Sequence, residues 1–256
     1  SNSAGTLAGV DAKIGEHVVA GALFSYNNTD ATLGSIGNGG HATIESYSGG
    51  IYGSYHQDGF YVNGLAAYTR NHYSSDRNIL FPGFAGTASA NANGNQESVN
   101  IDGGYDWHAT DRLTLGPIAG LQYVHLDVNG FNEIGAGAAD LNVNSENMDS
   151  LQSRVGGRIN YHLLTTNTSS FAADLHAAYQ HEFLDDSRGI GASFVGSGLT
   201  PFSVQTTSPL RDAGVVGLGL NFSFHERLTL FADYELLMWS SSTFEQTING
   251  GGRISF

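Results

Sequence analysis

The chain has 256 residues, of which 40% are hydrophobic and only 13% charged, about half the ~25% usual in soluble globular domains. Its 14 Phe and 12 Tyr residues exclude a disordered chain, because disordered chains are poor in aromatic residues. The net charge of −14 excludes the clustered basic surface needed by a nucleic-acid partner, and the absence of cysteine excludes disulfides and thiolate metal sites.

Most of the chain alternates between apolar and polar residues in steps of two, as β-strands with one apolar face do. Residues 112–126, for example, place Leu115 and Leu121 on one face and Thr114 and Gln122 on the other. In chain order the alternation predicts eleven strands, at 5–13, 17–28, 42–56, 59–72, 95–108, 112–126, 149–163, 170–184, 207–224, 227–240 and 244–256.

Segment length separates a membrane barrel from a soluble β-sandwich, which shows the same alternation. The segments run about 10–15 residues, whereas strands of soluble proteins average about 5–6. Aromatic residues gather near segment ends, as in the girdles at the two membrane interfaces, and the polar faces are rich in Gly, Asp, Glu and Arg, as a water-filled lumen allows. The sequence therefore predicts an all-β fold, a transmembrane antiparallel up-and-down β-barrel formed by one domain, 1–256.

The connections alternate between short turns and long loops, which is typical of outer-membrane barrels with short periplasmic turns and long extracellular loops. The long loops are expected at about 29–41, 73–94, 127–148 and 185–206. The first and the eleventh segment then both run toward the periplasm, whereas bacterial single-chain barrels have an even number of strands. We therefore expect a twelfth strand N-terminal to residue 1, which pairs with 244–256 and closes the ring.

Several fragments, in order along the chain, resemble those of one family. Four residues near the end, Asn249, Gly251, Ile254 and Phe256, fit the signal for assembly into the outer membrane. The fragments Gly9-Val10-Asp11, Gly50-Ile51-Tyr52-Gly53, Pro117-Ile118-Ala119-Gly120-Leu121-Gln122-Tyr123, Phe131-Asn132-Glu133 and His181-Glu182-Phe183 resemble motifs of the C-terminal translocator domain of type V autotransporters.

That resemblance implies a twelve-stranded barrel that exports its own N-terminal passenger to the cell surface, with an α-helix threaded through the pore. The implied partners are the passenger and the pore helix, outer-membrane lipid and lipopolysaccharide, the barrel assembly machinery and periplasmic chaperones. The family's first strand and pore helix are expected before residue 1. No enzymatic activity and no cofactor are implied.

Eight charged residues fall on the polar faces and are predicted to face the lumen: Asp102, Asp106, Arg154, Arg158, Asp174, Glu182, Asp233 and Glu235. Two interpretations stay open at this point. They form a hydrated wall of mutually paired charges, or some of them contact the pore helix, as the resemblance implies; in self-cleaving relatives a lumen acid helps to cut the junction with the passenger.

Other chemistry finds little support in the sequence. The ten histidines show no spacing typical of a metal site, and no nucleophile motif or phosphate-binding loop is present. The stretch 127–133 carries oxygen ligands without the spacing of a calcium loop, which favours a solvated loop. An outer-membrane barrel enzyme and a small porin remain the alternative functions.

Overall fold

The computed structural model describes residues 1–256 except 33–38, 185–188, 196–200, 206–210, 226 and 241–242. Its main sheet has the strand order β1-β2-β3-β4-β5-β7-β10-β11-β14-β15-β16, every neighbour antiparallel, with the short β6 pairing to β7. The strands are β1 (Asn2–Ile14), β2 (Val18–Thr32), β3 (His41–Gln57), β4 (Phe60–Phe81), β5 (Phe84–Tyr105), β6 (Trp107–His108), β7 (Leu113–Val128), β10 (Glu146–Thr165), β11 (Ser169–Glu182), β14 (Asp212–Phe224), β15 (Leu228–Ser240) and β16 (Thr243–Ile254).

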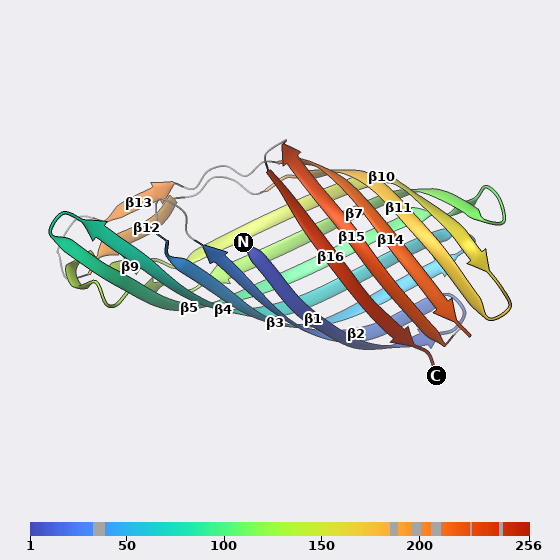
Figure 1. The fold of residues 1–256 in the computed structure, drawn as a ribbon, viewed down its shortest axis with the longest axis horizontal. Helices are drawn as coiled ribbons and strands as arrows, with labels where there is room; N and C mark the ends of the chain where they lie inside the picture. The colour runs from blue at the N-terminus through green and yellow to red at the C-terminus, as the bar shows by residue number, and fades with distance from the viewer. Residues whose placement is uncertain (33–38, 185–188, 196–200, 206–210, 226, 241–242) are drawn as a thin grey trace.

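Each of the eleven predicted strands is present, and the sheet is an up-and-down meander curled around a lumen (Figure 1). Tight turns join the strands at one end. Between β3 and β4, for example, Asp58 and Gly59 have φ angles of 50° and 85°, the positive values that suit a two-residue hairpin turn. Among the described residues no helix is both long enough and apolar enough to cross a membrane.

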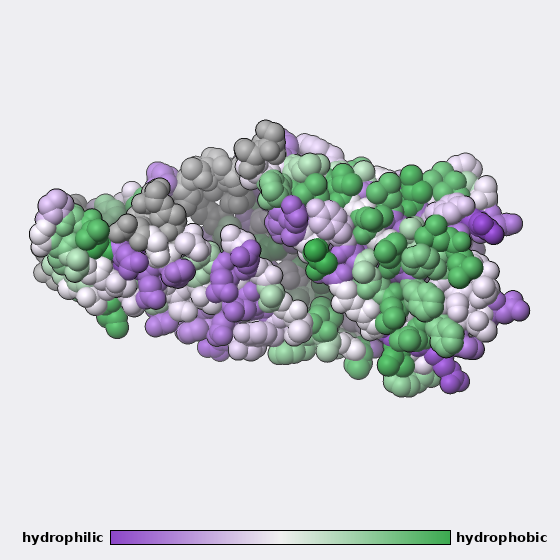
Figure 2. All heavy atoms as spheres, viewed as in Figure 1, coloured by the Kyte–Doolittle hydropathy of each residue, from purple (hydrophilic) through white to green (hydrophobic). Residues whose placement is uncertain are grey.

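The outer surface of the sheet is apolar where a soluble protein would be polar. Val10, Ile51 and Ile248 are 76%, 67% and 81% exposed, and their side chains point away from the lumen. Figure 2 shows apolar residues gathered over the end of the sheet that carries the tight turns, while polar residues are more frequent away from that end. This distribution is the one expected for a band of strands that faces lipid.

The prediction of a long loop at 73–94 was wrong, because β4 and β5 continue through it as a hairpin. Both strands are 22 residues long, and their register is unbroken from Phe60↔Tyr105 to Phe81↔Phe84. The flanking strands stop earlier: β3 last pairs with β4 at Asp76, and β7 last pairs with β5 at Gly94. Residues 77–93 therefore project from the sheet as an arm. Small residues at 85–92 keep the two-residue alternation that a strand needs, and Gly83 closes the turn with a φ of 89°.

Parts of two other predicted loops form a second sheet, with the order β13-β12-β9-β8. Its strands are β8 (Phe131–Asn132), β9 (Leu141–Val143), β12 (Gly189–Phe194) and β13 (Phe202–Gln205), and a 3-10 helix η1 (Gly137–Ala139) lies between β8 and β9. We call this sheet with η1 the cap. It is joined to the arm by an antiparallel bridge between Ile134 and Ser89.

The cap sits on the lumen-facing side of the arm. Ala92, Ala90 and Ala88 lie on the same face of β5 as the lumen residue Asp102. They are 8%, 6% and 1% exposed. Arg77 of β4 binds Glu133 through its Nε at 3.0 Å, and Glu133 also accepts the backbone N–H of Leu141 at 2.9 Å. Glu133 is 8% exposed, so the expectation of a solvated loop at 127–133 was wrong for this residue.

Candidate functional site: a polar network in the lumen

A cavity of about 480 Å³ lies inside the curled sheet, between walls contributed by seven strands from β4 to β15. Strand alternation turns one residue in two toward the lumen, so most residues that line the cavity are polar, although the outer surface of the same strands is apolar. Six of the eight predicted lumen residues line this cavity: Asp102, Arg154, Arg158, Asp174, Asp233 and Glu235.

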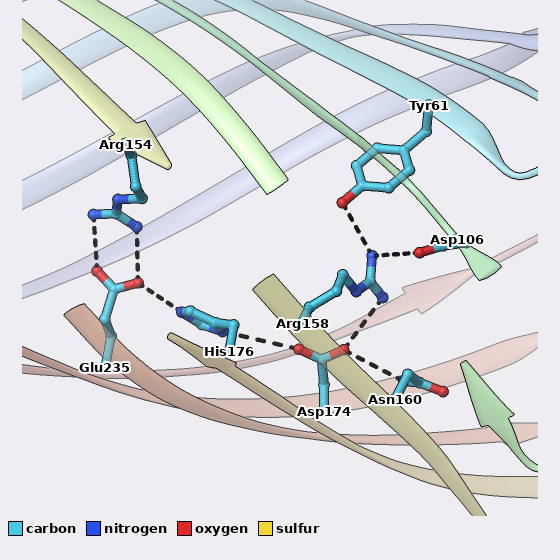
Figure 3. Close-up of polar contacts among 8 residues, drawn as sticks. All are labelled: Tyr61, Asp106, Arg154, Arg158, Asn160, Asp174, His176 and Glu235. Atoms are coloured by element: carbon cyan, nitrogen blue, oxygen red, sulfur yellow. Dashed lines mark hydrogen bonds and ion pairs between the residues drawn. The ribbon is translucent and has the colours of Figure 1, made fainter. Parts of the chain in front are cut away.

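One half of the network is built around Glu235 of β15. Arg154 of β10 reaches across the lumen and donates to both oxygens of Glu235, from Nη1 at 3.0 Å and from Nη2 at 3.2 Å. The same Nη2 also donates to Gln180 at 3.1 Å. His176 of β11 contacts Glu235 through Nε2 at 3.2 Å, and its Nδ1 lies 3.9 Å from Asp174 (Figure 3).

The other half is built around Arg158 of β10. Its Nη2 lies 3.2 Å from Asp174, and its Nη1 lies 3.7 Å from Asp106 and 3.4 Å from the Tyr61 hydroxyl (Figure 3). The guanidinium also lies over the Tyr61 ring, 5.6 Å from its centroid, in a cation–π arrangement. The buried atoms Arg158 Nε and Asp106 Oδ1 have no hydrogen-bond partner of their own.

A glycine makes room for the chain of contacts between these two halves. Gly217 of β14 pairs with both His176 and Glu235, so it lies between them in the same row of the sheet. A Cβ at this position would come within 2.1 Å of the His176 ring. Any larger residue would therefore displace the histidine from its place between the two carboxylates.

The remaining predicted residues lie outside this connected set. Asp102 accepts a hydrogen bond from Asn63 at 2.8 Å, and Asp233 lines the cavity without joining the network. Glu182 lies at the far end of β11, is 5% exposed, and accepts from Ser150 at 2.6 Å and from the Leu151 N–H at 2.9 Å. It ties β11 to β10 and does not line the cavity.

The sequence reasoning did not include His176, Gln180 and Tyr61 among the site residues. The alternation does place His176 and Gln180 on the polar face of their strand, so parity alone could have found them. Tyr61 lies near the start of the predicted strand 59–72. The polar residue Asn63, two positions further along β4, lies on the same face of the strand and could have indicated that this face lines the lumen.

The network holds charged side chains in place, and its geometry does not indicate a reaction. In the described part of the chain no three His, Asp or Glu side chains are arranged to hold a metal ion. Its members are paired with one another across four strands, an arrangement that stiffens a wall and presents polar atoms to whatever occupies the lumen.

A seam separates β1 from β16, the two strands at the ends of the main sheet. Because the ten pairings between them are all antiparallel, β1 and β16 point in the same direction, as Figure 1 shows. Arg253 of β16 crosses the seam and donates to Asp11 of β1 at 2.6 Å, and the Tyr52 hydroxyl donates to the same carboxylate at 2.8 Å. The described strands are therefore linked here by side chains and not by a β-ladder.

Comparison with known proteins identifies the family. Residues 1–235 match the family described as autotransporter beta-domain. The chain belongs to the autotransporter β-domain family. It is 22% identical over 252 residues to outer membrane protein B of Rickettsia typhi, covering 96% of this chain and 15% of that protein. It is also 22% identical over 227 residues to outer membrane protein A of Rickettsia rickettsii, covering 86% of this chain and 10% of that protein.

Solved structures of this family share the fold. The translocator domain of autotransporter NalP from Neisseria meningitidis superposes with a TM-score of 0.75 at 20% identity, covering 99% of this chain and 80% of that one. The β-domain of the Bordetella autotransporter BrkA gives a TM-score of 0.67 at 18% identity, covering 99% and 91%. The predicted family, strand architecture and integral outer-membrane location are thereby confirmed, and the chain is a transport domain.

Proposed function

We propose that this autotransporter β-domain exports the passenger part of its own protein across the outer membrane, through the lumen described above. The polar lumen enclosed by an apolar outer surface is the observation that carries the proposal, because it offers a polypeptide a hydrated route through lipid. The chain spans 15% and 10% of the two Rickettsia proteins, so proteins of this kind hold far more chain than the β-domain alone.

The lumen network is the part of the wall that would meet an occupying segment, such as a pore helix. Arg158 Nε and Asp106 Oδ1 accept or donate no hydrogen bond within the described residues, and a polar side chain of that segment could supply one. Asp102 and Asp233, which line the same cavity outside the network, are the next candidates for such contacts.

A catalytic role is not part of the proposal, and a porin is the alternative to be tested. A porin's lumen would conduct ions freely, whereas a lumen that holds a segment of chain would not. Conductance of the full-length protein in planar bilayers separates the two functions. Low conductance that rises when the segment before residue 1 is removed supports export, and equally high conductance for both proteins would favour a porin.

Export itself is tested in cells that make the full-length protein. A protease added outside intact cells should digest the passenger of the wild-type protein but should find none when residues 1–256 are deleted. Passenger that reaches the surface equally well without this domain would contradict the proposed function.

We also propose that one further strand, supplied by the protein's own chain before residue 1, fills the seam between β1 and β16. An open seam would leave the backbone N–H and C=O groups of both edges without hydrogen bonds in lipid. Each such group costs roughly several kcal/mol of stability. A strand antiparallel to both edges fits because β1 and β16 point the same way. Such a strand would run from the periplasm outward, which sends the preceding segment into the lumen.

Cysteine pairs test the width of the seam, since the chain has no cysteine of its own. Two strands flanking a third lie about 9.6 Å apart, twice the usual spacing of ~4.8 Å, whereas a disulfide needs Cα atoms within about 7 Å. Val10→Cys with Gly252→Cys should therefore form no disulfide in the full-length protein. An efficient disulfide would mean that β1 and β16 pair directly in a ring of eleven strands.

We propose that the barrel assembly machinery binds the C-terminal signal after periplasmic chaperones deliver the chain. The signal consists of Asn249, Gly251, Ile254 and Phe256. Ile254 is 63% exposed and Phe256 fully exposed, so both are accessible to such a partner and would otherwise meet outer-membrane lipid. Pairing between the last strand and a strand of the machinery would be a β-augmentation.

Deleting Phe256 should reduce insertion in cells severalfold, because the terminal anchor of this signal is lost. Refolding of the same variant in detergent should stay close to that of the wild type, since Phe256 follows the last strand and belongs to no ladder. Heat-modifiable gel mobility reports folding in both settings. Unchanged insertion in cells would show that Phe256 has no role in assembly.

A further inference from the structure

The cap is an amphipathic sheet whose two faces differ sharply. Because paired residues share a face, the register places one set together: Phe131, Leu141, Val143, Ile190, Ala192, Phe194, Phe202 and Val204. The opposite face carries polar and small residues: Asn132, Asn142, Gly191, Ser193, Ser203 and Gln205. A sheet built in this way needs a cover over its apolar face.

That apolar face is covered near the arm and uncovered away from it. Ala192 is only 6% exposed, and Gly86 of the arm lies close to Ala136 of the cap region. Phe194 and Phe202, whose rings pack 5.6 Å apart, are 37% and 36% exposed, and Val204 is 55% exposed. The exposed part therefore lies along β12 and β13, in a region that stands outside the lipid-facing band.

The outer edge of β13 offers main-chain groups beside these side chains. β13 pairs with β12 through Phe202–Gln205, and among the described strands nothing pairs with its other edge. A free edge next to an uncovered apolar face is the combination used in β-augmentation, where backbone hydrogen bonds give affinity and alternate side chains give specificity.

We propose that the exposed β12–β13 face and the free edge of β13 bind an extended segment of the protein's own exported chain, with apolar residues at alternate positions. This inference rests on the proposed export function. The cap packs on the lumen-facing side of the arm through Arg77 and Glu133, so it stands at the mouth from which an exported chain would emerge. A tethered chain meets this surface at an effective concentration on the order of millimolar, which a free partner seldom reaches.

The binding would give the emerging chain its first ordered strand outside the membrane. Pairing with a preformed edge removes part of the cost of nucleating a new sheet, because the template is already ordered. The passenger should therefore acquire its folded form faster with an intact cap than without one, while its passage through the lumen should be unaffected.

A photo-crosslinking amino acid placed in the full-length protein tests contact directly. At Val204, on the apolar face, it should yield an adduct within one polypeptide, seen as a change of gel mobility and mapped to the exported part. At Ser203, on the opposite face of the same strand, it should yield little. An adduct of doubled mass would identify a second copy as the occupant and overturn the proposal, as would the absence of any adduct at Val204.

Kinetics of passenger folding give a second, independent readout. Val204→Asp should delay the passenger's resistance to external protease by about threefold or more, while Ser203→Asp, with the same charge on the polar face, should not. Arrival at the surface should be equal in both variants, so a failure of export itself remains distinguishable from a failure of docking. Equal folding rates for Val204→Asp, Ser203→Asp and the wild type would contradict the inference.

Discussion

The lipid-facing band and the arm lie on the same two strands, yet they use opposite phases of one alternation. In the band, β5 turns Val99 and Ile101 outward and Asn100 toward the lumen. In the arm, the same strand turns polar residues such as Asn91 outward and buries Ala90 inward. The apolar phase therefore changes faces along β5 between Val99 and Ala92.

The difference shows that alternation alone indicates a strand. Which of the two faces is apolar indicates whether that face is in contact with lipid, water or another layer of the protein. Outside lipid, the arm and cap bury small apolar residues against each other, as water-soluble layers do. Inside lipid, the outer face must be apolar and the enclosed face may stay wet. The point of inversion on β5 is therefore where we expect the strand to leave the lipid.

The largest effect is expected from a charge on the outer face of the band. Ile101→Arg should destabilise the protein by about 2–4 kcal/mol, the range for a charge near the middle of the bilayer, because Ile101 lies deeper in the band than Val99. Asn100→Arg places the same side chain one residue away in the hydrated lumen and should cost far less. Denaturant titration of the variants in lipid vesicles measures both, and equal destabilisation would contradict the assignment of inner and outer faces.

In the arm the order should reverse. Ala90→Arg forces a long charged side chain into the contact with the cap, and overpacking of this kind costs about 1–3 kcal/mol. Asn91→Arg, on the exposed face, should cost almost nothing. The loss should be local, so hydrogen exchange in β8 and β9 is the measurement, with the band as internal reference. If Asn91→Arg loosened the cap more than Ala90→Arg, the proposed inversion of phase would be wrong.

The band was predictable from the sequence because its signal repeats in eleven segments, and each segment was long enough to show its period. The arm was missed although it has the same period, since Ala, Ser and Asn differ too little in polarity to stand out at 85–93. The pairing of Glu133 with Arg77 was also beyond prediction, because it joins residues 56 positions apart through two loops.

In the lumen, the alternation of residues along each strand predicted which side chains face the lumen. It did not predict which of them contact one another. Arg154 and Glu235 lie on strands separated by two others, and their contact depends on the curvature of the sheet. Gly217 is part of the same account, since the space it leaves for His176 appears only when three strands are aligned.

The smallest effect is expected where a bidentate ion pair faces water. In the lumen, Arg154 and Glu235 are 37% and 30% exposed, so solvent screens their attraction and Glu235→Gln should cost only about 0–1 kcal/mol. The corresponding pair between arm and cap is drier, with Glu133 only 8% exposed. There Glu133→Gln should loosen the cap by about 1.5–3 kcal/mol, the range for hydrogen bonds to charged groups.

Double-mutant cycles measure the two coupling energies. The cycle with Arg154→Gln is followed by denaturant titration, and the cycle with Arg77→Gln by hydrogen exchange. A lumen pair coupled more strongly than the cap pair would mean that the cavity is dry, and a dry cavity could not serve as a hydrated route for an exported chain.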